Sequence, residues 1–140
     1  MVKNISVRLL DVIADAQHLE VMVGDIGNAF IQAHTKEKIF TRLGKEFGDR
    51  AGCIALITRA LYGLTTSAER FRTMFADYLR SLGFTPARYD RDVRMRLRDS
   101  DNGYDYCCTH VDDFKIVARD PRKWIKKISK AFLLKSHGPR

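Results

Sequence analysis

The chain has 140 residues, 45% of them hydrophobic and 30% charged, which is typical of a single globular domain. No stretch approaches the roughly 18 apolar residues of a membrane span, and Asp11 and Asp15 interrupt the N-terminal segment, so we expect neither a membrane protein nor a secretory signal. A net charge of +8 favours anionic partners, nucleic acid before acidic membrane surfaces, although a basic but inert surface explains the charge equally well. An odd number of cysteines without Cys-x-x-Cys spacing predicts reduced, buried thiols in an intracellular protein: Cys53, Cys107 and Cys108.

The first half of the chain predicts one helix followed by short strands. Apolar residues recur at helical spacing over residues 5–17. Residues 19–27 alternate as a strand with Asp25 at its end, and the next six residues form a short helix or turn. Residues 38–43 are a further candidate strand, separated by a polar, glycine-rich loop from a second apolar run at 53–61.

The clearest predicted element is a helix over residues 67–82. Its apolar side chains are spaced by three and four positions, as expected for a face packed in the core. Thr65, Thr66 or Ser67 can cap its start, and Gly83 ends it. The side chains assigned to the core are Phe71, Met74, Phe75, Tyr78, Leu79 and Leu82.

The second half predicts a series of antiparallel strands and a last helix. Residues 93–98 alternate strictly between apolar residues and arginines, and an Asn-Gly turn leads to strands at 104–111 and 114–118. Asp120 caps the last helix and Pro121 is its first residue. Its buried face is assigned to Trp124, Ile125, Ile128, Ala131 and Phe132. This order of elements predicts an α+β fold in which an antiparallel sheet packs on helices.

Two adjacent carboxylates, Asp112 and Asp113, interrupt the last two strands and are expected at the tip of a tight hairpin. Asp is common in turns because its side chain binds its own backbone, so an ordinary turn is the simpler reading. Neighbouring carboxylates also repel each other, however, and a divalent cation removes that penalty. If Asp25 converges on the same point, the three acids suit Mg²⁺, and two ions about 3.5–4 Å apart can activate a hydroxyl and stabilise a leaving pyrophosphate.

Five segments, in order along nearly the whole chain, together resemble the reverse transcriptase of copia-type long-terminal-repeat retrotransposons. They read VMVGDIGNAFIQA, ALYGLTTSAERF, LRSLGFTPARYDRDV, THVDDFKIVARD and ISKAFLLKSHGP. The resemblance implies a right-hand polymerase palm with part of the fingers. It also implies RNA-directed DNA polymerase chemistry, with Mg²⁺ or Mn²⁺ as cofactor and an RNA or DNA template-primer and deoxynucleoside triphosphates as partners.

On this resemblance, residues 1–140 form a single partial reverse transcriptase domain, part of a retrotransposon polyprotein and inactive alone. The segment would lack the N-terminal fingers, the thumb and the ribonuclease H domain. Its location would be intracellular, in a cytoplasmic virus-like particle or the nucleus. Two alternatives stay open: a non-catalytic, basic nucleic-acid-binding remnant of a mobile element, and an inert fragment of one.

The resemblance also assigns metal-binding residues. Asp25 matches the first metal-binding acid, with the carbonyl of Ile26 beside it, and Asp112 matches the second metal ligand, with Asp113 as its neighbour in the acidic pair. The chain departs from the family at His110, which stands where a tyrosine is usual before Val-Asp-Asp.

Three further residues match nucleotide-binding positions. Phe30 would pack beneath the incoming sugar, where its ring leaves no room for a 2′-hydroxyl and so favours deoxynucleotides; it is equally suited to be a core aromatic. Tyr62 and Gly63 match the segment that packs under the templating base pair and the nucleotide, and Gly63 allows close approach of the backbone. Thr65 and Thr66 replace the family's usual Lys-Gln, which removes a positive charge near the nucleotide.

Overall fold

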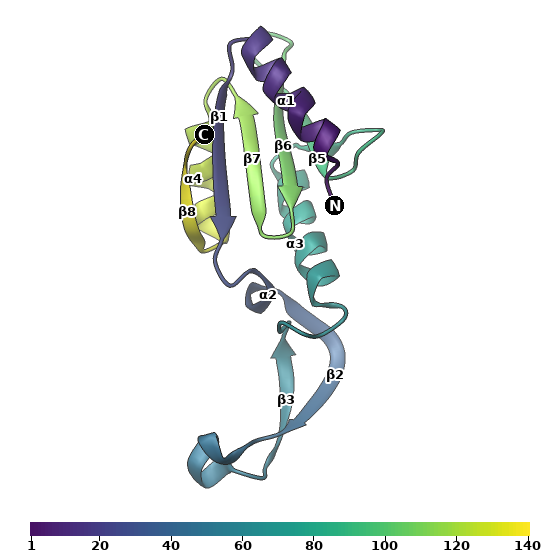
Figure 1. Ribbon diagram of the computed structural model, residues 1–140, viewed down its shortest axis with the longest axis vertical. Coiled ribbons are helices and arrows are strands. Elements are labelled where there is room, and N and C mark those ends of the chain that lie inside the picture. The colour runs from purple at the N-terminus through teal and green to yellow at the C-terminus, as the bar shows by residue number, and fades with distance from the viewer.

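A six-stranded antiparallel sheet forms the body of the protein in the computed structural model, which describes residues 1–140 (Figure 1). The strands lie in the order β4-β5-β6-β7-β1-β8, and a separate two-stranded ribbon, β2-β3, extends from one end. The strands are β1 (Glu20–Ile26), β2 (His34–Arg42), β3 (Ile54–Arg59), β4 (Thr85–Pro86), β5 (Val93–Leu97), β6 (Tyr104–His110), β7 (Asp113–Ala118) and β8 (Leu134–Pro139). The helices are α1 (Asn4–Ala16), α2 (Ala29–Gln32), η1 (Lys45–Arg50, a 3₁₀ helix), α3 (Ser67–Ser81) and α4 (Pro121–Ala131).

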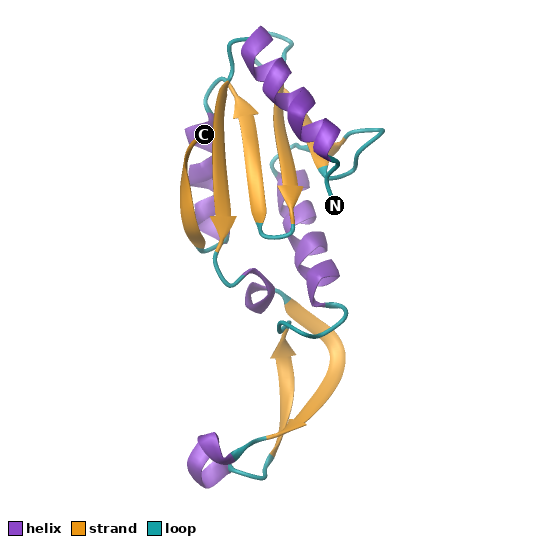
Figure 2. Cartoon of the chain, in the orientation of Figure 1, coloured by secondary structure: helices purple, strands orange, loops and turns teal.

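Helices cover both faces of this sheet, so the molecule has an α+β arrangement in which an antiparallel sheet packs on helices (Figure 2). The larger core, of 17 buried residues, lies between the sheet and α2, α3 and α4. A smaller core of 7 buried residues lies on the other face, beneath α1. No helix of the chain combines the length and the apolar character needed to cross a lipid bilayer.

Helix α3 forms where the periodicity predicts it. Phe71, Phe75 and Leu79 are fully buried, and the three other predicted core residues pack partly buried against the same cluster. Thr66 occupies the N-cap position, but its side chain caps no backbone amide. Gly83 follows the helix with a φ of 90°, a left-handed conformation that glycine adopts without strain.

Helix α4 begins as predicted, because the carboxylate of Asp120 accepts a hydrogen bond from the backbone amide of Lys123 and Pro121 is the first helical residue. Trp124 is 1% exposed, and its indole Nε1 donates to the buried carboxylate of Asp105 at 2.9 Å. One predicted core position is wrong: Ala131 is exposed, because the helix ends there and the extended backbone at the next residue turns Phe132 into the core instead.

Helix α1 lies where helical spacing predicts it, but half of its apolar side chains are exposed. Only Leu10 and Ala14 are buried, whereas Ile5, Leu9 and Val12 are more than half exposed. The helix rests on the sheet along one narrow line, because no element covers its outer side (Figure 1).

The β2-β3 ribbon has no buried residue of its own. Its strands pair antiparallel, with Ile39 opposite Ile57 and Phe40 opposite Leu56, and the predicted loop between them contains η1. Cys53 lies at the start of β3 and is exposed, so the prediction that all three cysteines are buried is wrong there. The ribbon cannot bury this thiol because nothing packs over its tip.

Candidate functional site

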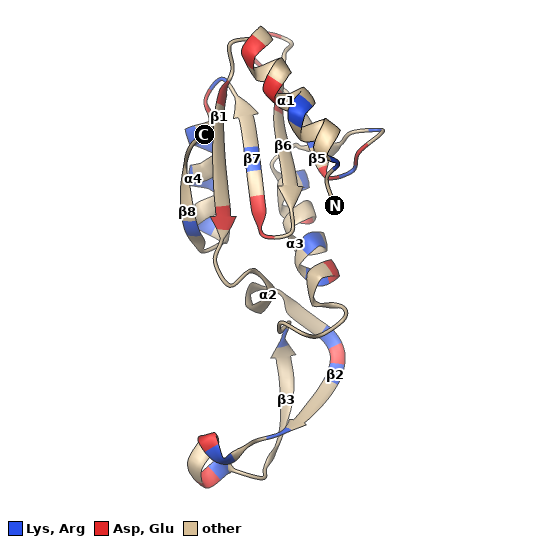
Figure 3. Cartoon of the chain, in the orientation of Figure 1, with Lys and Arg blue, Asp and Glu red and all other residues tan.

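Two of the three predicted acids lie on neighbouring strands, β1 and β7, and the third, Asp112, lies in the turn that precedes β7. Asp25 near the end of β1 lies directly opposite Asp113 at the start of β7. The next residue of β1, Ile26, donates its amide to the carbonyl of Asp112 at 2.9 Å. The acidic ends of the two strands lie side by side (Figure 3). Residues 87 positions apart thus meet at one point of the sheet.

The hairpin that carries the acidic pair is shifted by one residue from its predicted position. His110 pairs with Asp113, so the turn itself consists of Val111 and Asp112, and only Asp112 is at the tip. Val111 has a φ of 56°, whereas Asp112 does not have a positive φ. This combination of signs is that of a type II′ hairpin turn, in which glycine is usual at the first position. A β-branched residue there is strained, and such strain concentrates at functional sites.

The acids open onto two cavities on opposite sides of the hairpin. Asp25, Asp113 and His110 line a cavity of about 470 Å³ on the α1 side of the sheet. Asp112 lines a second cavity of about 350 Å³ together with Tyr62. The two adjacent carboxylates therefore line different cavities, because successive side chains point in opposite directions along an extended chain. Asp25 lines both cavities.

The carboxylates repel one another. Partial burial, followed by the negative charges of Asp112 and Asp25, raises the pKa of Asp113. The nearest cation to Asp25 is Lys135 on β8, whose Nζ lies 3.7 Å from Oδ2 of Asp25. Sequence reasoning did not single out Lys135, because its place beside Asp25 depends on β8 pairing with β1.

Divalent-cation binding can be tested against this geometry. No three side chains of the His, Cys, Asp and Glu types are placed together to hold a metal ion. Mg²⁺ keeps several waters and takes only one or two protein carboxylates, however, so the facing pair Asp25 and Asp113 fits it. Their carboxylate oxygens are hard donors, and a bound cation would relieve the repulsion between them.

The predicted nucleotide-binding residues lie next to the acids. Phe30 on α2 is half-buried, and its ring centroid lies 4.5 Å from that of Tyr62 and 6.4 Å from that of Phe71. Both readings of Phe30 stay open, because its ring packs on the core and also on the cavity-lining Tyr62. Tyr62 is 62% exposed. Gly63 has a φ of 95°, which favours glycine, and apart from its chain neighbours no atom lies within 4 Å of the place where a Cβ would stand.

One glycine ties the acids to the core. Gly24 on β1 lies opposite Phe114 on β7, one residue before Asp25 and one residue after Asp113 respectively. A Cβ atom at Gly24 would overlap the ring of Phe114, which is 2% exposed and has no room to move. The position of the facing carboxylates thus depends on this close approach.

The chain is similar to Pol polyproteins of plant transposons, of which three are described below. The chain is 27% identical over 144 residues to the retrovirus-related Pol polyprotein from transposon TNT 1-94 of Nicotiana tabacum. This alignment covers 99% of the chain and 11% of the relative. It is 24% and 22% identical to the corresponding polyproteins from transposons RE1 and RE2 of Arabidopsis thaliana, over 98% of the chain and 10% of each relative.

No family model matches the chain, and no solved structure matches it. The chain spans about a tenth of the length of the curated relatives. Its sequence is therefore similar to one segment of the Pol polyproteins of copia-type retrotransposons.

Proposed function

We propose that the chain is a palm-and-fingers segment of a reverse transcriptase and supports RNA-directed DNA synthesis within a longer retrotransposon polyprotein. The observation that carries this proposal is the pairing of Asp25 with Asp113 across neighbouring strands, with Asp112 at the adjoining hairpin tip. The similarity to Pol polyproteins over nearly the whole chain supports it. The substrates would be a template-primer and deoxynucleoside triphosphates.

Each residue would have a distinct part in nucleotidyl transfer. Asp25 and Asp113 would hold one Mg²⁺ or Mn²⁺ on the α1 side of the sheet, and Asp25, which borders both cavities, would share a second ion with Asp112 at the hairpin tip. The Ile26 backbone carbonyl is the fourth proposed ligand. A bound divalent cation lowers the pKa of an attacking hydroxyl and neutralises charge on a phosphate.

The second cavity would hold the nucleotide. Tyr62 lines it, and Phe30 fixes the Tyr62 ring from below. The contact between the two rings would give the cavity an aromatic wall, and Lys135 lines the same cavity. Gly63 follows Tyr62 in the chain and has no side chain, so it would leave room beside the Tyr62 ring for a sugar or base.

A second candidate function is non-catalytic binding of nucleic acid. The net charge of +8 favours it, and so does Lys135, because an ammonium group beside Asp25 competes with a metal for the same carboxylate. Binding of this kind weakens steeply with salt and needs no divalent cation.

A metal titration distinguishes the two functions. We expect Mg²⁺ or Mn²⁺ at millimolar concentration to perturb the nuclear magnetic resonance signals of the β1 and β7 ends, and Asp25→Asn or Asp113→Asn to weaken binding at least about tenfold. Asp49→Asn, in η1 of the ribbon and away from the site, is the matched control and should change nothing. Equal perturbation in all four proteins, or none, would contradict the metal site.

Primer extension on an RNA template tests the reaction itself. The proposal predicts Mg²⁺-dependent extension that Asp112→Asn abolishes, assayed both for this chain and for a longer polyprotein that contains it. Duplex binding that is lost with salt, unaffected by chelation and unaccompanied by extension in either protein would favour the non-catalytic alternative.

A further inference from the structure

Away from the acids, a third cavity, of about 450 Å³, lies between one face of α3 and the β4-β5 edge of the sheet. Four arginines line it: Arg72, Arg80, Arg91 and Arg94. A cavity of this size accommodates a small ligand. Four guanidinium groups around one cavity repel each other unless anions lie among them.

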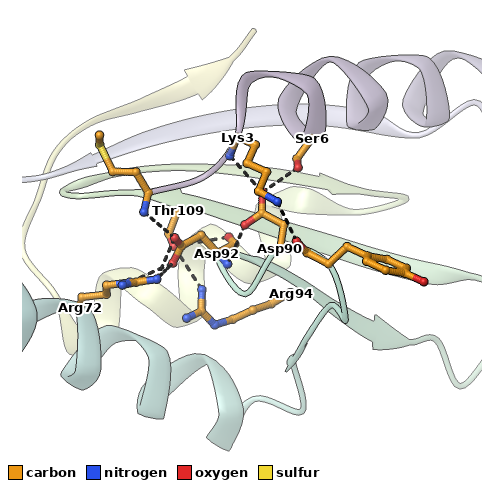
Figure 4. A network of polar contacts seen from close by, with 9 residues as sticks. Lys3, Ser6, Arg72, Asp90, Asp92, Arg94 and Thr109 are labelled. Carbon is orange, nitrogen blue, oxygen red and sulfur yellow. Dashed lines mark hydrogen bonds and ion pairs between the residues drawn. The ribbon is translucent and has the colours of Figure 1, made fainter.

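Arg94 is the unusual member of this cluster. Its side chain lies on the α3 face of β5 and is 6% exposed, yet it forms no ion pair. A guanidinium has five N–H donors, and the hydrogen bond from Arg94 to the hydroxyl of Thr109, at 3.1 Å, uses one of them (Figure 4). Burial of its charge is the main cause that lowers the pKa of Arg94; Arg72 and Arg80 act in the same direction, and the nearby carboxylate of Asp92 acts against them. Because Asp92 is already bound to Arg72 and to the N-terminal ammonium, an anion in the cavity would further offset the cost of burying the Arg94 charge.

The neighbouring acids are already engaged or lie at the rim. Asp92 accepts two hydrogen bonds from Nη2 and one from Nε of Arg72, and also pairs with the N-terminal ammonium (Figure 4). Asp77 pairs with Arg80 at 2.7 Å, one helical turn away. Glu69 is the remaining carboxylate that lines the cavity. Its single negative charge does not balance the two guanidinium groups that form no ion pair, those of Arg91 and Arg94.

We propose that this cavity is a binding site for a phosphate group, held by Arg94 at its base and Arg91 at its rim. Arginine presents donors in a rigid fork that matches phosphate oxygens bidentately. Arg72 and Arg80 keep the local potential positive even though each has its own carboxylate. A phosphate dianion complements two unpaired guanidinium groups better than a single carboxylate does, because its charge is larger and its oxygens accept from both. The site does not depend on Asp25, Asp112 or Asp113.

The test is a titration of the whole chain with inorganic phosphate at constant ionic strength, followed by the arginine Nε–H signals and by the melting temperature. We expect saturable binding on the order of 1 mM and a melting temperature that rises with phosphate, since a ligand of the folded state stabilises it. Arg94→Met should weaken binding about tenfold or more, and Arg91→Gln severalfold. Arg88→Gln is the matched control, because Arg88 lies in the same loop but does not line the cavity.

Arg91 is exposed, so Arg91→Gln tests the site even if Arg94→Met does not fold. Binding that is the same in wild type, Arg91→Gln and Arg88→Gln, or absent in wild type, would overturn the proposal. A dinucleotide with and without a 5′-phosphate identifies the source of the group. A requirement for the 5′-phosphate assigns the site to a nucleic-acid end, and equal binding of both assigns it to an internal phosphodiester.

Discussion

The six-stranded body and the β2-β3 ribbon belong to the same chain but are stabilised in different ways. The body has two cores of 17 and 7 buried residues, one on each face of its sheet. The ribbon has paired strands and no buried residue, and it exposes Phe40, Ile54 and Leu56. An isolated two-stranded ribbon is marginal in water, because hydrogen bonds alone contribute little net stability.

This difference assigns separate roles to the two regions. The acids lie where rigid strands of the body end, so their geometry is fixed by core packing. The ribbon follows β1 through α2, and Phe30 on α2 contacts Tyr62, in the segment that follows β3, and Phe71 on α3 of the body. We therefore expect the position of the acids to persist under conditions in which the ribbon opens.

The largest expected effect comes from truncating one aromatic in each region. Phe71→Ala in the body should lower the free energy of unfolding by about 3–5 kcal/mol, because its ring is fully buried and contacts Phe30, Phe75 and Phe132. Phe40→Ala in the ribbon should cost no more than about 0.5 kcal/mol. Urea denaturation measures both. Comparable losses would mean that the ribbon contributes to the folded core.

Hydrogen exchange of the native protein sharpens the comparison without mutation. Amides at Cys107 and Ile116, in the centre of the sheet, should exchange at least about a hundredfold more slowly than those at Thr41 and Ala55 in the ribbon, because the ribbon opens locally while the body opens only globally. The exchange is followed by nuclear magnetic resonance. Equal protection in both regions would show that they open together.

The smallest expected effect is a gain of stability at the edge where the two regions meet. The pKa of Asp113 is raised above the ordinary 3.8, so the folded state holds its proton to higher pH than the unfolded state does. Stability then falls as the pH rises from about 4 through that raised pKa. Asp113→Asn should therefore be more stable than wild type at neutral pH, with no difference in acid, as measured by urea denaturation at each pH. The same variant should lose affinity for Mg²⁺, so that stability and metal binding change in opposite directions.

The spacing of apolar residues in the sequence predicted the helices and strands that bury a full face. The remaining elements depend on strand pairing in the folded protein. Helices α3 and α4 and the β5-β6 hairpin carry strong local signals, and each formed where the sequence indicated it. Strand β8 has no alternating pattern and becomes a strand because the free edge of β1 pairs with it.

The candidate site was predicted in its residues but not in its details. The convergence of Asp25 with Asp112 and Asp113 was expected, whereas the one-residue shift of the turn was not, because it depends on Val111 adopting a left-handed conformation. The alternation over residues 93–98 predicted that the arginines and the apolar residues lie on opposite faces of the strand. It did not reveal that the arginine side of β5 faces α3, so the burial of Arg94 could not be predicted.

The overlap that a side chain at Gly24 would cause has an evolutionary consequence. A substitution there would displace the Phe114 ring, and with it the strand segments on which Asp25 and Asp113 lie. Selection on the carboxylates alone would therefore also preserve a small residue that contacts no ligand.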